Sequence, residues 1–157
     1  MIVDTLIHAR WIIPVEPESV TYEYHSLAID KGSMTDLLPT DLAKQKYQGT
    51  VTENLSTHAL LPGFVNCHTH AAMSLMRGIA DDLPLMDWLQ NYIWPLESKW
   101  MSEAFVRDGT DLAIAEMLRG GTTCFNDMYF YPDVTAQQAV QHGIRACVGL
   151  IVIDFPT

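Results

Sequence analysis

Apolar and polar residues alternate along the first part of the chain, and this period of two is typical of half-buried β-strands. The strands predicted in this way cover Thr5 to Ile13, Val20 to Ile29, Met34 to Leu38 and Val51 to Leu55. Lys31-Gly32 is a turn signal between the second and third strands. Asp41 to Tyr47 is predicted to form one short helix. We therefore expect residues 1–57 to form a small β unit.

From residue 58 onward the pattern changes to apolar strands separated by amphipathic helices. The first strand runs into His68-Thr69-His70, and a long connection over about residues 71 to 101 follows. The next helix starts after Ser102, a favourable N-cap, and stops at Gly120-Gly121. A second strand, a second helix and a third strand are predicted over Thr122 to Asn126, Pro132 to His142 and Ile144 to Ile153.

Apolar strands that alternate with helices predict parallel β/α units and hence the α/β fold class. A complete eight-fold barrel needs about 250 residues, whereas this sequence has 157. We therefore expect residues 58–157 to hold the first three β/α units of a larger structure, in a chain that looks truncated.

The most informative motif is His68-Thr69-His70, at the end of an apolar run that starts at Ala59. Residues i and i+2 of a strand lie on one face, so both imidazoles can reach one metal ion, and zinc accepts imidazole nitrogens. A catalytic zinc takes about three protein ligands and keeps one open position, so two histidines are not a complete site. The alternative is two ordinary histidines near a turn. Cys67 is expected to point to the opposite face as a buried thiol.

Composition argues against several classes of function. The net charge is −10 with only 9 lysines and arginines, which argues against a nucleic-acid-binding surface. The three cysteines are widely spaced, which favours reduced thiols and a cytoplasmic location over a disulfide framework. The N-terminus lacks a basic segment followed by an apolar one, and no apolar run reaches the ~18 residues of a membrane helix. We expect neither a signal peptide nor a membrane partner.

Three stretches of the chain carry a family resemblance. Residues 61–70, with the sequence LPGFVNCHTH, resemble the first-strand signature of the metal-dependent amidohydrolase superfamily. Residues 77–89 and 93–97, RGIADDLPLMDWL and IWPLE, narrow the resemblance, as does GGTTCFNDM over residues 120–128. Together these stretches resemble the 5-methylthioadenosine/S-adenosylhomocysteine deaminases, and the resemblance covers most of residues 55 to 155.

The resemblance implies a TIM-like (β/α)8 barrel, preceded by part of a small β-sandwich domain over residues 1–57. It also implies one divalent metal ion, most often zinc, and His68 and His70 match the family's first two metal ligands. The remaining ligands and the proton-moving carboxylate of that family lie on later strands, so the general acid/base is expected beyond residue 157.

The reaction that the resemblance implies is hydrolytic deamination of an adenine nucleoside to its inosine counterpart and ammonia. A small-molecule substrate and a homo-oligomeric complete protein in the cytoplasm are implied with it. Because later ligands are missing from this sequence, the 157-residue chain alone is expected to be inactive.

Glu97 matches the family residue that contacts the ribose hydroxyls, and a carboxylate accepts hydrogen bonds from two neighbouring hydroxyls well. The alternative is an exposed glutamate near Lys99. Trp88, Trp94 and Leu85 lie in the connection after the first strand, where barrels place active-site loops. They are expected either to wall the substrate pocket, with Trp88 as the substrate-binding candidate, or to pack the loop onto the barrel.

Asp127 ends the second strand, a position where barrels place functional groups, and ranks below Glu97 as a candidate. Two other functions stay open. The same fold and metal would serve for guanine, another aminated heterocycle or a chlorinated triazine, none of which offers a ribose diol to Glu97. The second alternative is a truncated, inactive chain.

Overall fold

A computed structural model describes residues 1–152 of the chain. It divides into two compact units, Met1–Pro62 and Gly63–Thr157. The first unit ends at Pro62, later than position 57, because strand β4 (Gln48–Leu60) continues through that position. Ala59 and Leu60 therefore belong to β4, and the apolar run that leads into the His-x-His motif is interrupted at Pro62-Gly63.

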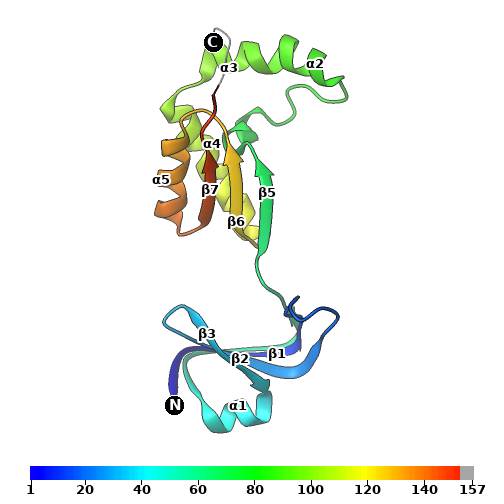
Figure 1. The fold of residues 1–157 in the computed structure, drawn as a ribbon, viewed down its shortest axis with the longest axis vertical. Coiled ribbons are helices and arrows are strands. Elements are labelled where there is room, and N and C mark those ends of the chain that lie inside the picture. Colours follow the sequence, from blue (N-terminus) through cyan, green and yellow to red (C-terminus); the bar gives the residue numbers. More distant parts are fainter. Residues whose placement is uncertain (153–157) are drawn as a thin grey trace. The chain divides into compact units, whose positions relative to one another are not determined.

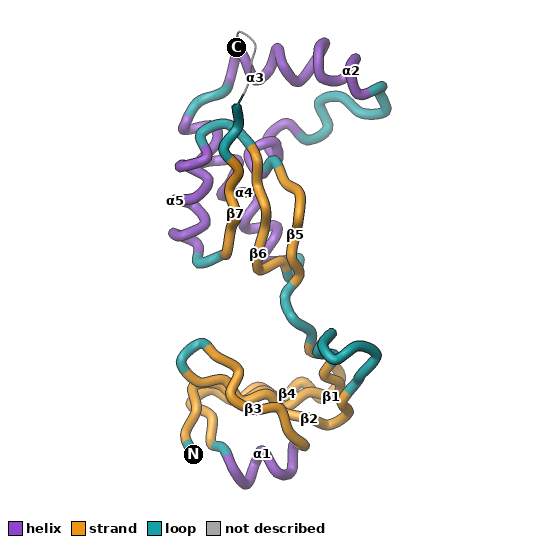
Figure 2. The backbone as a smooth tube through the Cα atoms, in the orientation of Figure 1, coloured by secondary structure: helices purple, strands orange, loops and turns teal. Residues whose placement is uncertain are grey.

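The first unit is a four-stranded sheet with one helix, as Figures 1 and 2 show. The strand order is β3-β2-β1-β4. The antiparallel strands are β1 (Ile2–Ile12), β2 (Tyr22–Asp30) and β3 (Ser33–Pro39), and β4 pairs with β1 in parallel. Helix α1 (Thr40–Lys46) contacts β2 and β3. The predicted strands and helix are thus confirmed to within a few residues, whereas the sandwich stays a prediction because these residues form one sheet.

Side chains from the sheet and from α1 form the core of the first unit. Val3, Leu6 and Ala28 are buried against Ala43 and Tyr47. The predicted turn at Lys31-Gly32 is confirmed: both residues have positive φ, 51° and 73°. This is the backbone conformation that a tight hairpin turn requires.

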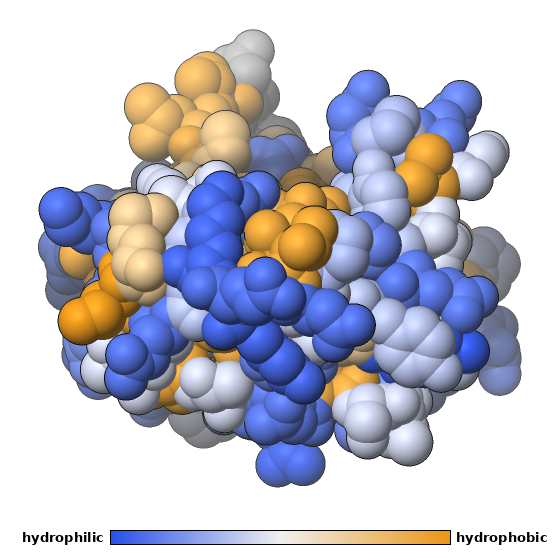
Figure 3. All heavy atoms as spheres, turned by 90° about the horizontal axis from the view of Figure 1, so that it is seen from below, coloured by the Kyte–Doolittle hydropathy of each residue, from blue (hydrophilic) through white to orange (hydrophobic). Residues whose placement is uncertain are grey.

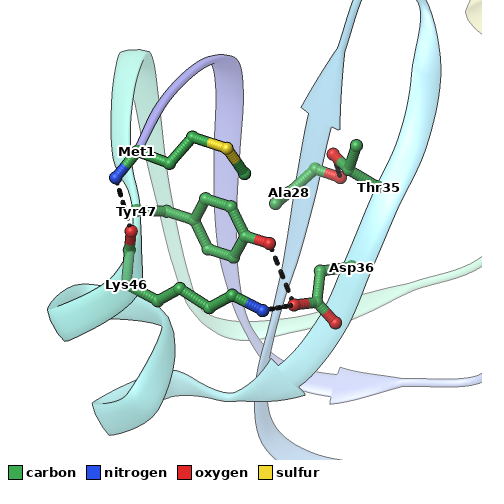
Figure 4. Close-up of polar contacts among 6 residues, drawn as sticks. All are labelled: Met1, Ala28, Thr35, Asp36, Lys46 and Tyr47. Carbon is green, nitrogen blue, oxygen red and sulfur yellow. Dashed lines mark hydrogen bonds and ion pairs between the residues drawn. The ribbon is translucent and has the colours of Figure 1, made fainter.

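Asp36 accepts hydrogen bonds from two side chains at the end of α1: Lys46, its last residue, and Tyr47, the residue after it. The Lys46 Nζ lies 2.7 Å from Asp36 Oδ2, and the buried Tyr47 donates its hydroxyl to the same oxygen at 3.0 Å (Figure 4). In the same view, the Met1 ammonium donates to the carbonyl of Lys46 at 2.7 Å. The bonds from Lys46 and Tyr47 hold the pKa of Asp36 below its ordinary value.

A lowered carboxyl pKa predicts a pH-dependent stability. Such a group stabilises the folded state above its unfolded pKa, about 3.9 for aspartate, and the contribution is lost as the pH falls through the lowered folded pKa. We expect Asp36→Asn to reduce the free energy of unfolding in urea at neutral pH, and to have much less effect at pH about 2. The control Glu18→Gln, in an exposed loop, should change little at either pH. A defect of Asp36→Asn that is equally large at both pH values would contradict the assignment.

Several apolar side chains of the first unit are exposed: Met34 is 76% exposed and Val51 is 50% exposed. On the face drawn in Figure 3, hydrophilic residues predominate and the apolar ones appear in separate groups. Single apolar residues scattered over a surface are ordinary in folded proteins.

The second unit contains three parallel strands in the order β5-β6-β7. They are β5 (Phe64–Thr69), β6 (Thr122–Met128) and β7 (Arg145–Gly149), joined by helices that include α4 (Glu103–Arg119) and α5 (Pro132–His142). The two helices pack against β6 and β7, and Phe125 of β6 is completely buried beside Ile114, Ala139 and Ile144. The predicted parallel β/α arrangement and the α/β class are confirmed (Figure 1).

The predicted helix ends agree with the structure. Ser102 accepts a hydrogen bond from the backbone N–H of Phe105 through its hydroxyl, as an N-cap does, and Gly143 ends α5 with a φ of 69°. The third strand is shorter than predicted: β7 ends at Gly149, and Ile153 lies outside the described residues.

The prediction that Cys67 is a buried thiol is wrong. Cys67 is exposed, and Phe64 and Val65 of the same strand are 59% and 61% exposed. The physical reason is that β5 is an edge strand within residues 1–152, and the helices pack against β6 and β7.

The connection after β5 is mostly helical. It starts with the 3₁₀ helix η1 (Ala71–Met76) and continues after a turn with α2 (Leu85–Trp88), the π-helical η2 (Leu89–Ile93) and α3 (Trp94–Trp100). The π-helical segment ends two residues before Pro95, which has no N–H to donate and so disturbs the regular α-helical ladder.

Helix α4 holds η1 in place. Gly109 of α4 approaches the backbone of Ala72 so closely that a Cβ atom there would collide with it. Arg77, just after η1, donates two hydrogen bonds to Glu116 of α4, at 2.9 and 2.6 Å. The segment that follows His70 is therefore fixed at both of its ends.

Candidate functional site

The two histidines of the motif lie side by side at the end of β5. Their ring centroids are 5.0 Å apart and the rings meet edge to face. His70 is half-buried and His68 is exposed. The structure thus brings together the two imidazoles that the spacing predicts on one face.

The hydrogen bond of His70 fixes which of its nitrogens is free. Its Nδ1 lies 2.6 Å from the carbonyl oxygen of Met128 on β6. Because a carbonyl can only accept, Nδ1 carries the proton, and Nε2 is left with its lone pair. A metal-binding histidine is usually held in this way, with its second ring nitrogen donating to a carbonyl or carboxylate.

Glu97 lies near the same histidine, on α3. The hydroxyl of Tyr129 donates to Glu97 Oε1 at 2.7 Å, and the ring of Tyr129 is 6.0 Å from that of His70. Glu97 is half-buried, which excludes the alternative of an exposed glutamate; Lys99 instead stacks on Trp100. Burial raises the pKa of Glu97, and the bond from Tyr129 and the nearby His70 offset part of the increase.

Tyr129 is held as a hydrogen-bond donor. Its side chain is 5% exposed and packs in an apolar cluster with Ala72, Val106 and Val134. Burial raises its pKa strongly, and the neighbouring Glu97 raises it further. The hydroxyl therefore keeps its proton at neutral pH and directs it at the carboxylate.

Asp127 occupies the end of β6 and is 1% exposed. Its Oδ1 accepts from the backbone N–H of Ala71 at 2.7 Å and from the hydroxyl of Thr69 at 2.9 Å. Burial raises the pKa of Asp127, and these two hydrogen bonds offset part of the rise. The carboxylate thus contacts the residues on both sides of His70.

A pocket of about 510 Å³ opens beside His70, within the volume range of small-molecule sites. Its lining includes the apolar side chains of Met73, Met76 and Trp88 and the acidic side chains of Asp81 and Asp82. Trp88 is therefore placed at a cavity that His70 shares. Leu85 is 65% exposed and Trp94 is 38% exposed, and neither lines this pocket.

Residues 1–152 do not contain a group of three or more His, Cys, Asp or Glu side chains arranged to hold a metal ion. His68 and His70 are therefore the pair of donors that the described residues offer at this strand end. Over the same residues, no helix is long and apolar enough to cross a membrane.

Residues 59–156 match the model of the amidohydrolase family. The chain belongs to this family. It is 49% identical over 154 residues to a 5-methylthioadenosine/S-adenosylhomocysteine deaminase of Saccharophagus degradans. The aligned residues cover 98% of this chain and 34% of the relative. The chain spans about a third of the length of the curated relatives that it resembles.

Solved structures share the fold. An adenosine deaminase from Xanthomonas campestris with bound zinc superimposes with a TM-score of 0.97 at 51% identity, over 99% of this chain and 36% of that one. An atrazine chlorohydrolase from Arthrobacter aurescens complexed with zinc gives a TM-score of 0.81 at 22% identity, over 92% of this chain and 35% of that one. The second likeness shows the fold alone.

Two residues of the site carried too weak a signal in the sequence. Tyr129 was not singled out, because its partner Glu97 is 32 positions away and nothing local marks the pair. Asp127 was placed below Glu97, although it contacts the histidine strand directly. Its place at the C-terminal end of a parallel strand was the available signal.

The bond between Tyr129 and Glu97 should contribute measurably to stability. We expect Tyr129→Phe to lower the free energy of unfolding by about 1 kcal/mol, the usual net value of one hydrogen bond. The matched control Tyr92→Phe removes a hydroxyl from a tyrosine that is 41% exposed and should change stability much less. Equal effects of the two variants in urea denaturation would show that the bond contributes nothing.

Proposed function

We propose that the chain forms part of a metal-dependent hydrolytic deaminase of adenine nucleosides, with 5-methylthioadenosine and S-adenosylhomocysteine as substrates. The observation that supports it best is the pair of histidines His68 and His70, in which His70 has its Nε2 free. Near this pair lies the carboxylate of Glu97, which Tyr129 holds by a hydrogen bond. The relatives named as deaminases of these two nucleosides, at up to 49% identity, give the substrate class.

The residues present fit a divalent metal ion such as zinc. His70 offers Nε2 because Met128 holds its Nδ1, and His68 offers a second imidazole on the same strand end. A bound metal of this kind would lower the pKa of a water molecule toward about 7 and so supply a nucleophile at neutral pH. His68 and His70 would hold the metal and would not move protons.

Glu97 would bind the ribose. An ionised carboxylate offers about four acceptor positions, so the bond from Tyr129 leaves room for two ribose hydroxyls. Trp88 and the other apolar side chains of the pocket would face the rest of the nucleoside. Water then replaces the amino group on the purine carbon and ammonia leaves, with the required protons moved by groups that these residues do not include.

A (β/α)8 barrel formed together with further strands would complete the site, since about three protein ligands are needed and two are found here. For the same reason we propose that residues 1–157 by themselves have no deaminase activity. The three free cysteines support a cytoplasmic location, where thiols stay reduced. Homo-oligomerisation stays a prediction.

Ammonia release from nucleosides and guanine, together with chloride release from chlorinated triazines, tests the proposed function. In the protein encoded by the complete reading frame, 5-methylthioadenosine and S-adenosylhomocysteine should be converted to their inosine counterparts with the highest kcat/KM. Guanine and chlorinated triazines should be poor substrates, because they offer no diol to Glu97. If guanine or a triazine is clearly the best substrate, the proposed nucleoside deaminase is wrong, and a guanine deaminase or triazine hydrolase replaces it.

Substituting a metal ligand should remove the metal. We expect His68→Ala to lose most of the bound metal and nearly all turnover, because one imidazole fewer leaves the site short of ligands. Elemental analysis of the purified protein measures this. The control His58→Ala removes an exposed histidine of β4 and should retain the metal. A well-folded His68→Ala protein with full metal content would refute the assignment.

Glu97→Gln tests the contact with ribose. The loss of a charged hydrogen bond should weaken transition-state binding of nucleosides by about 1.5–3 kcal/mol in kcat/KM. Deamination of an aminated base without ribose should suffer much less, and Glu53→Gln, on exposed β4, should affect neither substrate. Equal losses on both kinds of substrate would give Glu97 another role.

A further inference from the structure

The ladder between β5 and β6 is interrupted at Cys67 and His68, just before His70. Pairing reaches Asn66 and resumes at Thr69, with a register shift between them. Side chains of β6 take over across this gap. The amide of Asn126 donates to the carbonyl of Cys67 at 3.1 Å, and the Thr69 hydroxyl lies 2.9 Å from both the Asn126 carbonyl and Asp127 Oδ1.

Asp127 holds the residues on both sides of His70, through the side chain of Thr69 and the backbone of Ala71. Its Oδ1 accepts from Thr69, the residue between the two histidines, and from the N–H of Ala71, the residue after them. With these neighbours fixed, the Cα of His70 and the direction of its side chain are fixed as well. The bond from His70 Nδ1 to the Met128 carbonyl then sets the rotation of the ring.

The burial of Asp127 costs stability that its contacts only partly offset. The residue is 1% exposed, and its Oδ2 has no hydrogen-bond partner among residues 1–152. An unpaired buried polar atom is destabilising, and a carboxylate more so than a neutral group. Such a group at a strand end fits a role in positioning the residues that it contacts.

We propose that Asp127 is a positioning residue for the metal ligands: its carboxylate holds Thr69 and Ala71 so that His68 and His70 converge on one ion. This inference rests on the proposed metal site. The residue contacts neither the metal nor the substrate in this role, and acts through hydrogen bonds to the ligand strand. Removing outer contacts of metal ligands commonly weakens metal binding by about 10–100-fold.

Zinc affinity of the protein encoded by the complete reading frame, measured by competition with a chromophoric chelator, tests the proposal. Asp127→Ala removes both hydrogen bonds and should weaken zinc binding by about 10–100-fold. Thr69→Val is isosteric and removes the contacts of the hydroxyl to Asp127 and to the Asn126 carbonyl. It keeps the bond from the Ala71 N–H to Asp127, so it should give a smaller loss in the same direction. Asp127→Asn keeps an oxygen that can accept both bonds and should restore most of the affinity.

Ile114→Val is the control for a general loss of stability, since Ile114 is 1% exposed in the core of the same unit. It should lower the melting temperature without changing zinc affinity. If Asp127→Ala does not fold, the zinc affinity of Thr69→Val, compared with that of the wild-type protein, tests the proposal.

Three results would overturn the proposal: unchanged affinity in Asp127→Ala and Thr69→Val, equal losses in Asp127→Asn and Asp127→Ala, or an equal loss in Ile114→Val. The second result would mean that the charge acts, not the hydrogen bonds. A wild-type protein that binds no zinc, or a His68→Ala protein that binds it fully, would instead refute the proposed function itself.

Discussion

The hydrogen bonds from the end of β6 to the end of β5 are the constraint on which the candidate site depends. The histidine motif lies on an edge strand within the described residues, and its regular ladder breaks at the motif. Asp127 and Met128 restore the order through their contacts to Thr69, His70 and Ala71. Without them, the spacing of the two histidines would fix a shared face and little more.

The same strand end continues into the part of the site that is proposed to bind the substrate. Tyr129 follows Met128 directly and directs its hydroxyl at Glu97, which arrives from α3. The helical segment that carries Glu97 accommodates Pro95 through its π-helical turn. Residues 126 to 128 therefore contact the strand end that carries the histidines, and the next residue, Tyr129, contacts the half-buried carboxylate.

Local patterns were enough to predict much of the second unit. Ser102 marks the start of a helix through its side-chain hydroxyl, Gly120 and Gly143 mark helix ends, and the structure confirms these boundaries. The helical nature of residues 85–100 was missed, because Pro95 and the aromatic residues around it obscure a continuous period. Cys67 was misjudged because alternation predicts a face but not what covers that face.

The proximity of the two histidines was predictable from the sequence, whereas the contacts that hold them in place were not. His68 and His70 are two positions apart, so the strand geometry alone places them together. Their contacts to β6 join residues more than fifty positions apart, and no local pattern encodes them. The amidohydrolase family match explains why the motif occurs at this strand end, while the hydrogen bonds explain how the chain holds it.

The tautomer of His70 tests the central claim most directly. Two-bond ¹⁵N–¹H NMR correlations of the metal-free protein, at pH about 8.5 where free imidazole is neutral, distinguish a protonated Nδ1 from a protonated Nε2. Because the Met128 carbonyl can only accept, His70 should carry its proton on Nδ1 and leave Nε2 free for a metal. A His70 ring protonated on Nε2, or one that exchanges freely between the two forms, would contradict this account.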